Sequence, residues 1–146
     1  MKIPKKTKFR KYHKINVKNK IEVKKTKLSY GVYGVKALEN GYLRMAQMKR
    51  IKEDIVKKLK GKTNIYFNFY PIFGLTNKGT ARMGSGKGDI DDWYVPVKRG
   101  KILIEFVNCL IPKGEIQKML KTNSLKWPIE VILTTVKKNL DENIKK

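Results

Sequence analysis

The spacing of apolar residues along the chain predicts two helices. Between residues 44 and 60, apolar side chains recur at intervals of three and four with Lys and Arg between them, which is the spacing of one buried helix face. These positions are Met48, Ile51, Ile55 and Leu59. Gly61 follows as a C-terminal stop. Residues 112–126 repeat the pattern over a shorter length. Their inward positions are Ile116, Met119 and Leu120.

Four stretches rich in β-branched and aromatic residues predict strands. They are LSYGVYGVKAL (28–38), TNIYFNFYP (63–71), WYVPVKRGKILIEFV (93–107) and IEVILTTV (129–136). In the first stretch, Gly31 and Gly34 indicate a close approach of another backbone. The third stretch reads as a hairpin that turns at Arg99-Gly100, and residues 71–91 before it read as one long loop.

This order of strands, helix, strand, long loop, hairpin, helix and strand contains no βαβ alternation. We therefore expect an α+β fold, a single domain with two helices packed on a mixed or antiparallel sheet. Residues 28–136 form this domain, residues 1–27 precede it as an extended basic arm, and residues 137–146 follow as a polar tail. The arm has too few apolar residues to order itself alone, and its aromatic residues Phe9 and Tyr12 favour a partner that orders it.

The charge of the chain predicts that the protein binds a polyanion. The 146 residues include 35 Lys and Arg but only 12 Asp and Glu, a formal net charge of +23, which attracts nucleic acid or an anionic membrane. Residues 1–27 carry twelve of the basic side chains and one acid. Apolar residues in the arm alternate and do not follow a helical period, which argues against a membrane-bound helix. The single cysteine, Cys109, excludes an internal disulfide and a multi-cysteine metal site.

The glycine-rich segment ARMGSGKGDIDDWY (81–94) is the clearest candidate for chemistry, because such loops can hold phosphate. The P-loop pattern fails, since Ala81 stands at the first glycine position and Gly88 at the hydroxyl position. The dinucleotide pattern G-x-G-x-x-G fails as well, and a strand follows the loop where a helix is needed. A loop with glycines, Arg82, Met83 and Lys87 instead suits insertion into folded RNA, where phosphates and unstacked bases are recognised.

No residue pattern indicates an enzyme. Asp89, Asp91 and Asp92 lack the spacing of a calcium loop and read as a solvated turn. His13, the only histidine, lies in the basic arm, away from any candidate nucleophile. We therefore expect no catalytic residues, no cofactor and no metal site.

Three segments carry a family resemblance. PKKTKFRKYHK (4–14), SYGVYGVKAL (29–38) and ARMGSGKGDIDDWYVPVKRGKILIEF (81–106) resemble, in order, motifs of the bacterial-type large-subunit ribosomal protein L-sixteen family, which is related to the archaeal and eukaryotic L-ten-e proteins. The resemblance implies a hammerhead-type α+β domain that binds large-subunit ribosomal RNA. It also implies that the glycine loop extends toward the transfer RNA in the aminoacyl site and, as a further option, in the peptidyl site.

Site residues follow from the resemblance by position. The arm residues that would contact ribosomal RNA are Lys5, Lys6, Lys8, Arg10, Lys11, His13 and Lys14. The loop residues near transfer RNA or ribosomal RNA would be Arg82, Met83, Gly84, Gly86, Lys87 and Gly88. The sequence departs from the family in two places that matter here: Ser85 replaces a loop lysine, and Arg44 stands where a hydroxyl N-cap of the first helix is usual.

We therefore expect a structural constituent of the large ribosomal subunit that supports assembly and translation, with ribosomal RNA, transfer RNA and other large-subunit proteins as partners. We expect neither membrane association nor a homo-oligomer. The alternative is a free-standing RNA-binding or RNA-modifying factor. The abundance of Lys, Ile and Asn, which have A/T-rich codons, indicates an A/T-rich genome such as that of an organelle. The lysine-rich composition and the basic tail favour a mitochondrial form, with a plastid or a bacterial cytoplasm as alternatives.

Overall fold

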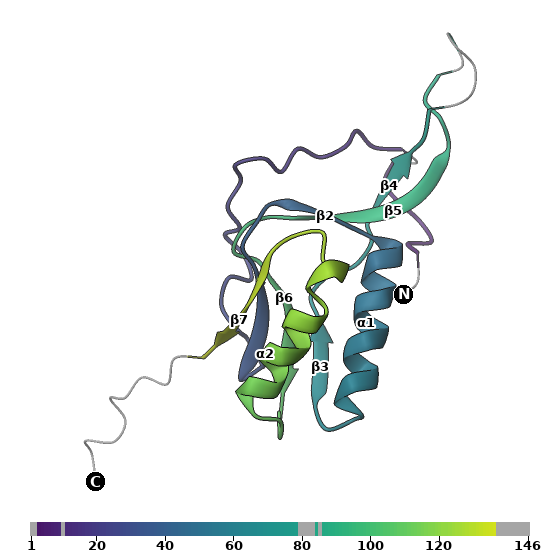
Figure 1. Cartoon of the computed structure of the whole chain (residues 1–146). Helices are drawn as coiled ribbons and strands as arrows, with labels where there is room; N and C mark the ends of the chain where they lie inside the picture. The colour runs from purple at the N-terminus through teal and green to yellow at the C-terminus, as the bar shows by residue number, and fades with distance from the viewer. Residues whose placement is uncertain (1–2, 10, 79–83, 85, 137–146) are drawn as a thin grey trace.

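The computed structural model describes residues 3–9, 11–78, 84 and 86–136, and it has the expected α+β fold (Figure 1). The elements in chain order are β1 (Tyr33–Ala37), β2 (Gly41–Arg44), α1 (Met45–Leu59), β3 (Asn64–Phe67), β4 (Phe73–Thr76), β5 (Ile90–Val97), β6 (Ile102–Val107), α2 (Lys113–Thr122), the 3-10 helix η1 (Ser124–Lys126) and β7 (Val131–Thr135). Among the described residues, the strands form two antiparallel sheets, ordered β3-β6-β1-β7 and β2-β5-β4.

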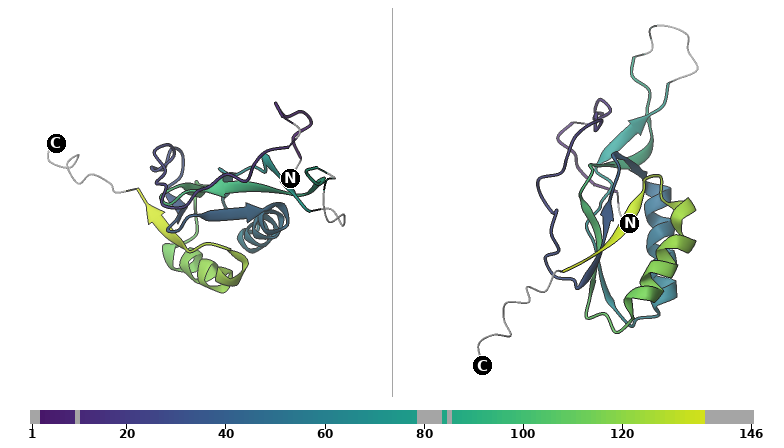
Figure 2. Two further views of the ribbon diagram at one scale, coloured as in Figure 1. Left: turned by 90° about the horizontal axis from the view of Figure 1, so that it is seen from above. Right: turned by 60° about the vertical axis from the view of Figure 1, so that its left-hand side comes forward.

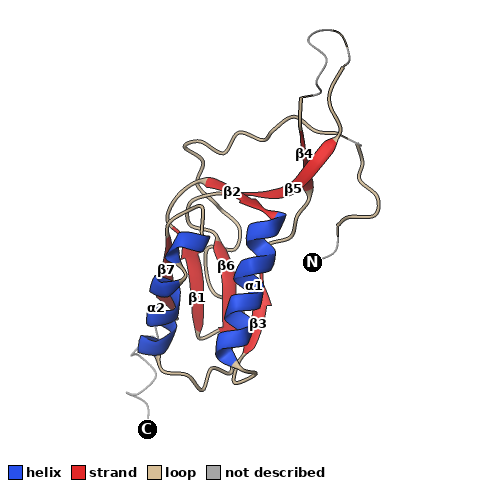
Figure 3. Ribbon diagram, turned by 45° about the vertical axis from the view of Figure 1, so that its right-hand side comes forward, coloured by secondary structure: helices blue, strands red, loops and turns tan. Residues whose placement is uncertain are grey.

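The molecule is layered. Both helices cover one face of the four-stranded sheet, and the three-stranded sheet extends from its end (Figure 3). The N-terminal arm runs along the opposite side from the helices (Figure 2). No helix in the described part of the chain is long and apolar enough to span a bilayer.

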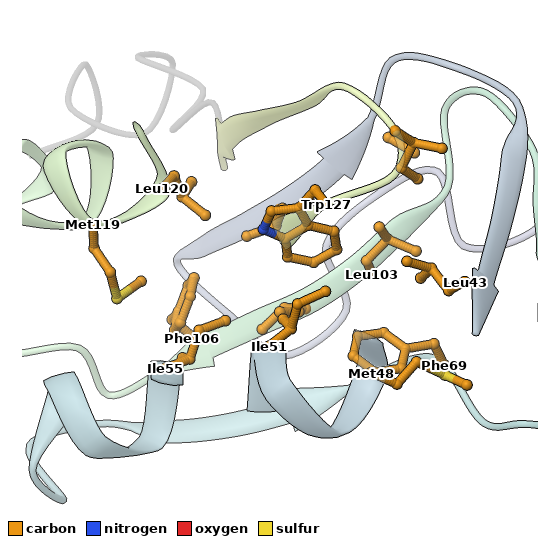
Figure 4. Close-up of a cluster of buried hydrophobic side chains, with 14 of the residues drawn as sticks. Leu43, Met48, Ile51, Ile55, Phe69, Leu103, Phe106, Met119, Leu120 and Trp127 are labelled. Carbon is orange, nitrogen blue, oxygen red and sulfur yellow. The ribbon is translucent and has the colours of Figure 1, made fainter. Parts of the chain in front are cut away.

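The core lies between the helices and the four-stranded sheet (Figure 4). All four apolar positions predicted for the first helix and all three predicted for the second are buried. The central strand β6 is buried from Ile102 to Phe106. Each such aliphatic or aromatic side chain contributes about 1.5–3 kcal/mol on burial, so this layer is the main source of stability.

Gly31 and Gly34 behave as predicted, because β6 passes very close to both. A Cβ atom at Gly31 would lie 2.8 Å from the carbonyl oxygen of Phe106, and one at Gly34 would lie 2.3 Å from Leu28 Cδ2 and 3.0 Å from the carbonyl oxygen of Ile104. A side chain at either position would push β1 away from its neighbour.

Helix α1 begins without a hydroxyl cap, as the sequence indicated. The Arg44 side chain has only donors and cannot accept a bond from the first turn. Gln47 compensates in part, because its Oε1 accepts a hydrogen bond from the Arg44 backbone N–H at 2.9 Å. At the other end, Lys60 adopts a left-handed conformation with a φ of 44° immediately before Gly61, whose φ is 76°.

The predicted hairpin over residues 93–107 is wrong. Both strands exist and the chain turns at Gly100, whose φ is 91°, but β5 and β6 belong to different sheets. The reason is that β5 is already paired on both edges, with β2 and β4. The true hairpin is β4–β5, since residues 73–76 of the predicted loop form β4. The glycine-rich connection therefore spans residues 77–89.

Candidate nucleic-acid interface

The arm is extended but is not separate from the domain. Its Ile15 N–H donates to the Tyr94 hydroxyl at 3.3 Å, and its Ile15 carbonyl accepts from the Tyr42 hydroxyl at 2.6 Å. Val17 is 2% exposed. Further along, the N–H of Glu22 donates to the carbonyl of Arg99 at 3.0 Å. The arm was expected to need a partner in order to become ordered, and for this stretch strands β2 and β5 supply contacts within the same chain.

The two aromatic residues of the arm also contact the domain. Tyr12 packs edge-on against Phe73 of β4, with ring centroids 5.5 Å apart, and Phe9 packs against Tyr12 at 5.6 Å. Lys14 places its ammonium 4.5 Å from the centroid of the Tyr42 ring, a cation–π contact. The partner that Phe9 and Tyr12 indicated is thus the chain's own three-stranded sheet.

The arm and the glycine-rich connection are joined by reciprocal contacts, which we call the arm–loop clasp and which comprise Lys11, Tyr12, Lys87 and Asp89. Lys11 Nζ donates to the Lys87 carbonyl at 2.7 Å, and Lys87 Nζ donates to the Tyr12 carbonyl at 2.6 Å. Lys11 Nζ also lies 3.3 Å from Asp89 Oδ1. The structure thus brings together two segments that are more than 70 residues apart in sequence and that were both predicted to face RNA.

The clasp divides the predicted arm residues into two groups. The exposed members are Lys5, Lys6, Lys8, His13 and Lys14. Lys11 is half-buried, and its ammonium is occupied by the connection. Arg10 lies outside the described residues. We call this exposed group the cationic stripe of the arm. Tyr12 and Lys14 place the end of the stripe beside the three-stranded sheet, and Lys11 holds that end to the connection.

The predicted loop residues are only partly described. Gly84 and Gly86 adopt φ values of 86° and 69°, a backbone conformation that favours glycine, and a Cβ atom added at either position would have no neighbour within 4 Å. Lys87 is exposed and Gly88 is half-buried. Arg82 and Met83 lie outside the described residues. Strands β4 and β5, which flank this connection, extend away from the helix-covered sheet (Figure 1).

A pair of exposed tyrosines was missed by the sequence reasoning. Tyr30 is 75% exposed and Tyr66 is 52% exposed, and their ring centroids are 5.7 Å apart on the sheet face opposite the helices. Large aromatic rings that remain exposed on a strongly cationic protein are typical stacking surfaces for unpaired bases. Both tyrosines stood in predicted strands, but sequence alone did not indicate that the two strands bring them together.

One buried carboxylate organises this pair. Glu105 lies opposite Tyr66 in the β3–β6 register and is 2% exposed. Its Oε2 accepts hydrogen bonds from the backbone N–H groups of Ser29, Tyr30 and Gly31 at 3.0, 2.9 and 3.2 Å, and its Oε1 accepts from Asn68 Nδ2 at 2.9 Å. Burial alone raises the pKa of Glu105, but these four bonds to the charged form outweigh it and lower the pKa below its ordinary value.

Comparison with known proteins agrees with the motifs and the fold. The model of the family Ribosomal protein L16p/L10e matches residues 4–134. The large ribosomal subunit protein uL16m of Dictyostelium discoideum is 56% identical over 142 residues, which are 97% of this chain and 98% of that protein. The uL16c protein of Helicosporidium sp. subsp. Simulium jonesii is 34% identical, covering 88% of this chain and 92% of its own length. The uL16 protein of Blochmanniella floridana is 31% identical, covering 91% and 98%.

Proposed function

The chain belongs to the ribosomal protein L16p/L10e family, and from this premise we propose how it acts in the ribosome. It is a structural constituent of the large subunit and not an enzyme, in line with relatives that are named as large-subunit proteins. Association with ribosomal RNA and with other ribosomal proteins follows from that place. The relative with 56% identity has the mitochondrial designation uL16m, which supports the mitochondrion as the compartment.

We propose that the cationic stripe of the arm contacts large-subunit ribosomal RNA. The observation that carries this proposal is the arm–loop clasp. Lys11 binds the Lys87 carbonyl and Lys87 binds the Tyr12 carbonyl, so the part of the arm that carries His13 and Lys14 has a defined position beside the three-stranded sheet. A preorganised set of charges loses little conformational entropy on meeting phosphates. The contribution of each lysine is the release of counterions from RNA.

We further propose that the clasp orients the glycine-rich connection toward the transfer RNA in the aminoacyl site, with the peptidyl site as a second option. This part rests on the family resemblance, on the direction of β4 and β5, and on the glycines that permit a close backbone approach. Arg82→Ala is then expected to slow peptide synthesis more than it reduces subunit assembly. Equal losses of peptide synthesis and of subunit assembly would mean that the connection acts only in assembly.

Salt titration of RNA binding tests the role of the arm. The purified full-length chain is titrated onto a large-subunit ribosomal RNA fragment, and the logarithm of the affinity is plotted against the logarithm of salt concentration. Replacing two lysines that contact phosphates should reduce the slope by about 1.5. We therefore expect this change for the Lys5→Ala, Lys6→Ala variant. The matched control removes two exposed lysines of α2, Lys113→Ala and Lys118→Ala. Equal slopes for both variants would contradict the proposed stripe.

A further inference from the structure

A groove of about 570 Å³ lies between α2 and strand β7, away from the arm and its cationic stripe. Its wall is mostly apolar. The main apolar residues are Leu120, Trp127, Ile129, Val131 and Leu133. Three consecutive residues of β7, Val131, Ile132 and Leu133, all line it. Successive side chains of a strand point to opposite faces, so the groove follows the edge of the strand, where its backbone is accessible.

Strand β7 is at the edge of its sheet, and its outward-facing backbone groups can be identified. The Leu38 N–H donates to the Glu130 carbonyl, and the Val136 N–H donates to the Val32 carbonyl. The β1–β7 register has no shift between these points. Because hydrogen-bonded pairs alternate along an antiparallel ladder, the even-numbered residues bond to β1. The N–H and C=O groups of Val131, Leu133 and Thr135 therefore face away from the sheet, as on an edge that can accept another strand.

A buried donor in the same wall lacks a partner. Trp127 is 7% exposed, and within the described part of the chain its indole Nε1 has no hydrogen-bond acceptor. Figure 4 shows the indole nitrogen at the end of the ring turned toward Leu120, another residue of the groove. An unpaired buried N–H costs about 1–3 kcal/mol. The nitrogen has almost no accessible surface, so a carbonyl oxygen of a segment in the groove would reach it only if the indole turned outward.

The groove also differs in charge from the rest of the molecule. Glu39 and Glu130 line it, and the Glu130 N–H donates to Glu39 Oε2 at 3.4 Å, so the two acids are adjacent. Lys121 is the one basic residue of the lining, which leaves a net negative charge within a chain of net charge +23. Such a site disfavours a phosphate backbone and favours Lys or Arg side chains.

We propose that this groove binds an extended, basic segment of another large-subunit protein, which adds a strand to the free edge of β7. Main-chain hydrogen bonds to the odd-numbered residues of β7 provide affinity, and the apolar pockets and two glutamates select alternating apolar and basic side chains. The inference goes beyond the proposed RNA contacts and rests only on the chain's place in the large subunit.

Site-directed cross-linking in assembled subunits tests the proposal. A benzophenone maleimide is attached to Ile132→Cys in a Cys109→Ser background, the labelled chain is incorporated into large subunits, and cross-linked peptides are identified by mass spectrometry. We expect a peptide from another ribosomal protein that contains Lys or Arg. The same label at Leu110→Cys, an 86% exposed position outside the groove lining, should not capture that peptide. Cross-links from position 132 to ribosomal RNA or to this chain itself would overturn the proposal. A yield of the protein cross-link from position 132 that is no higher than the yield from position 110 would overturn it as well. Failed incorporation of the unlabelled chain would instead count against the proposed function.

Two further variants test the mode of binding. Val131→Pro removes an outward N–H at the first residue of an edge strand, a position where proline is tolerated, and Val131→Ala retains that N–H. We expect the cross-link from position 132 to fall at least about fivefold in the proline variant only, with the melting temperature confirming that both fold. Glu39→Lys with Glu130→Lys, a change at two exposed positions, should also reduce the yield. Undiminished yields in the proline and the lysine variants would rule out strand addition by a basic segment.

Discussion

Glu105 shows how much of this fold depends on one residue. It is a single carboxylate in the otherwise apolar strand β6, and it fixes two segments that are remote in sequence, residues 29–31 and Asn68. The sequence reasoning treated ILIEFV only as an apolar strand. A lone acid at a central position of such a strand was the available signal, because a buried charge must have partners.

Two substitutions of Glu105 should distinguish the contribution of its hydrogen bonds to the free energy of unfolding from the contribution of its side-chain volume. Glu105→Ala leaves the N–H groups of residues 29–31 without their acceptor, and we expect a loss of about 3 kcal/mol or more in the free energy of unfolding. Glu105→Gln retains one carbonyl oxygen and should lose about half as much. Urea denaturation measures both values. Equal stability of the alanine variant and the unchanged chain would show that the segment does not need this acceptor.

Low pH should reduce the stability that the charged Glu105 carboxylate provides. The folded-state pKa of Glu105 is below its ordinary value of 4.5, so the charged form stabilises the fold fully above pH 4.5, and this contribution is lost as the pH falls through the lower folded-state pKa. Asp54, whose pKa is lowered by Lys126, changes in the same direction. Glu105→Gln should therefore show a shallower loss of stability below pH 4.5 than the unchanged chain. Parallel curves would mean that Glu105 does not contribute to acid sensitivity.

The tyrosine pair makes a prediction about base recognition. If Tyr30 and Tyr66 stack on unpaired bases, Tyr30→Ala should weaken binding of single-stranded oligoadenylate by about fivefold or more. It should leave binding of an abasic oligomer of equal charge unchanged, because only phosphate contacts remain there. Leu125→Ala, at a 97% exposed position on η1, is the control. Equal weakening for both oligomers would argue against stacking.

At the scale of elements, the sequence predicted what depends on local periodicity and missed what depends on pairing. Both helices and their inward faces were correct, because a 3.6-residue period is a property of one segment. The hairpin at Arg99-Gly100 was wrong, because the partner of a strand is decided by edges that lie elsewhere in the chain. Strand β4 was missed because it has only four residues and includes Gly74.

For the candidate site, the sequence likewise predicted the separate segments but not the contacts between them. The basic arm and the glycine-rich segment were identified from composition and motif, but their union in the clasp was not. No local pattern indicates that Lys11 bonds to the backbone of residue 87, since that contact exists only after β4 and β5 pair. The exposed tyrosine pair was hidden for the same reason.

The clasp should control the order of the arm. Lys87→Ala removes the bond to the Tyr12 carbonyl, and we expect faster deuterium exchange of residues 11–17 by roughly fivefold, the effect of one hydrogen bond. Lys6→Ala, which removes an exposed lysine of the arm, is the control. The same exchange rates in both variants would show that the three-stranded sheet holds the arm without the clasp.

At the scale of the whole molecule, the packed core provides stability, and the positive charge is available for binding RNA. The helix-covered sheet supplies a stable body, and the opposite side carries the arm, the clasp and the tyrosine pair. No Lys or Arg among the described residues is buried, so the positive charge has no role in packing the core. A chain of net charge +23 repels itself when compact, which is consistent with a protein whose working state is a complex with RNA.

The most direct test of this account is sedimentation of the full-length tagged chain from mitochondria on a sucrose gradient. We predict that it migrates with the large ribosomal subunit, and that a variant lacking residues 1–14 stays near the top of the gradient although it remains folded. A full-length chain found only as a free monomer, or a truncated chain that enters large subunits as well as the intact one, would contradict the account.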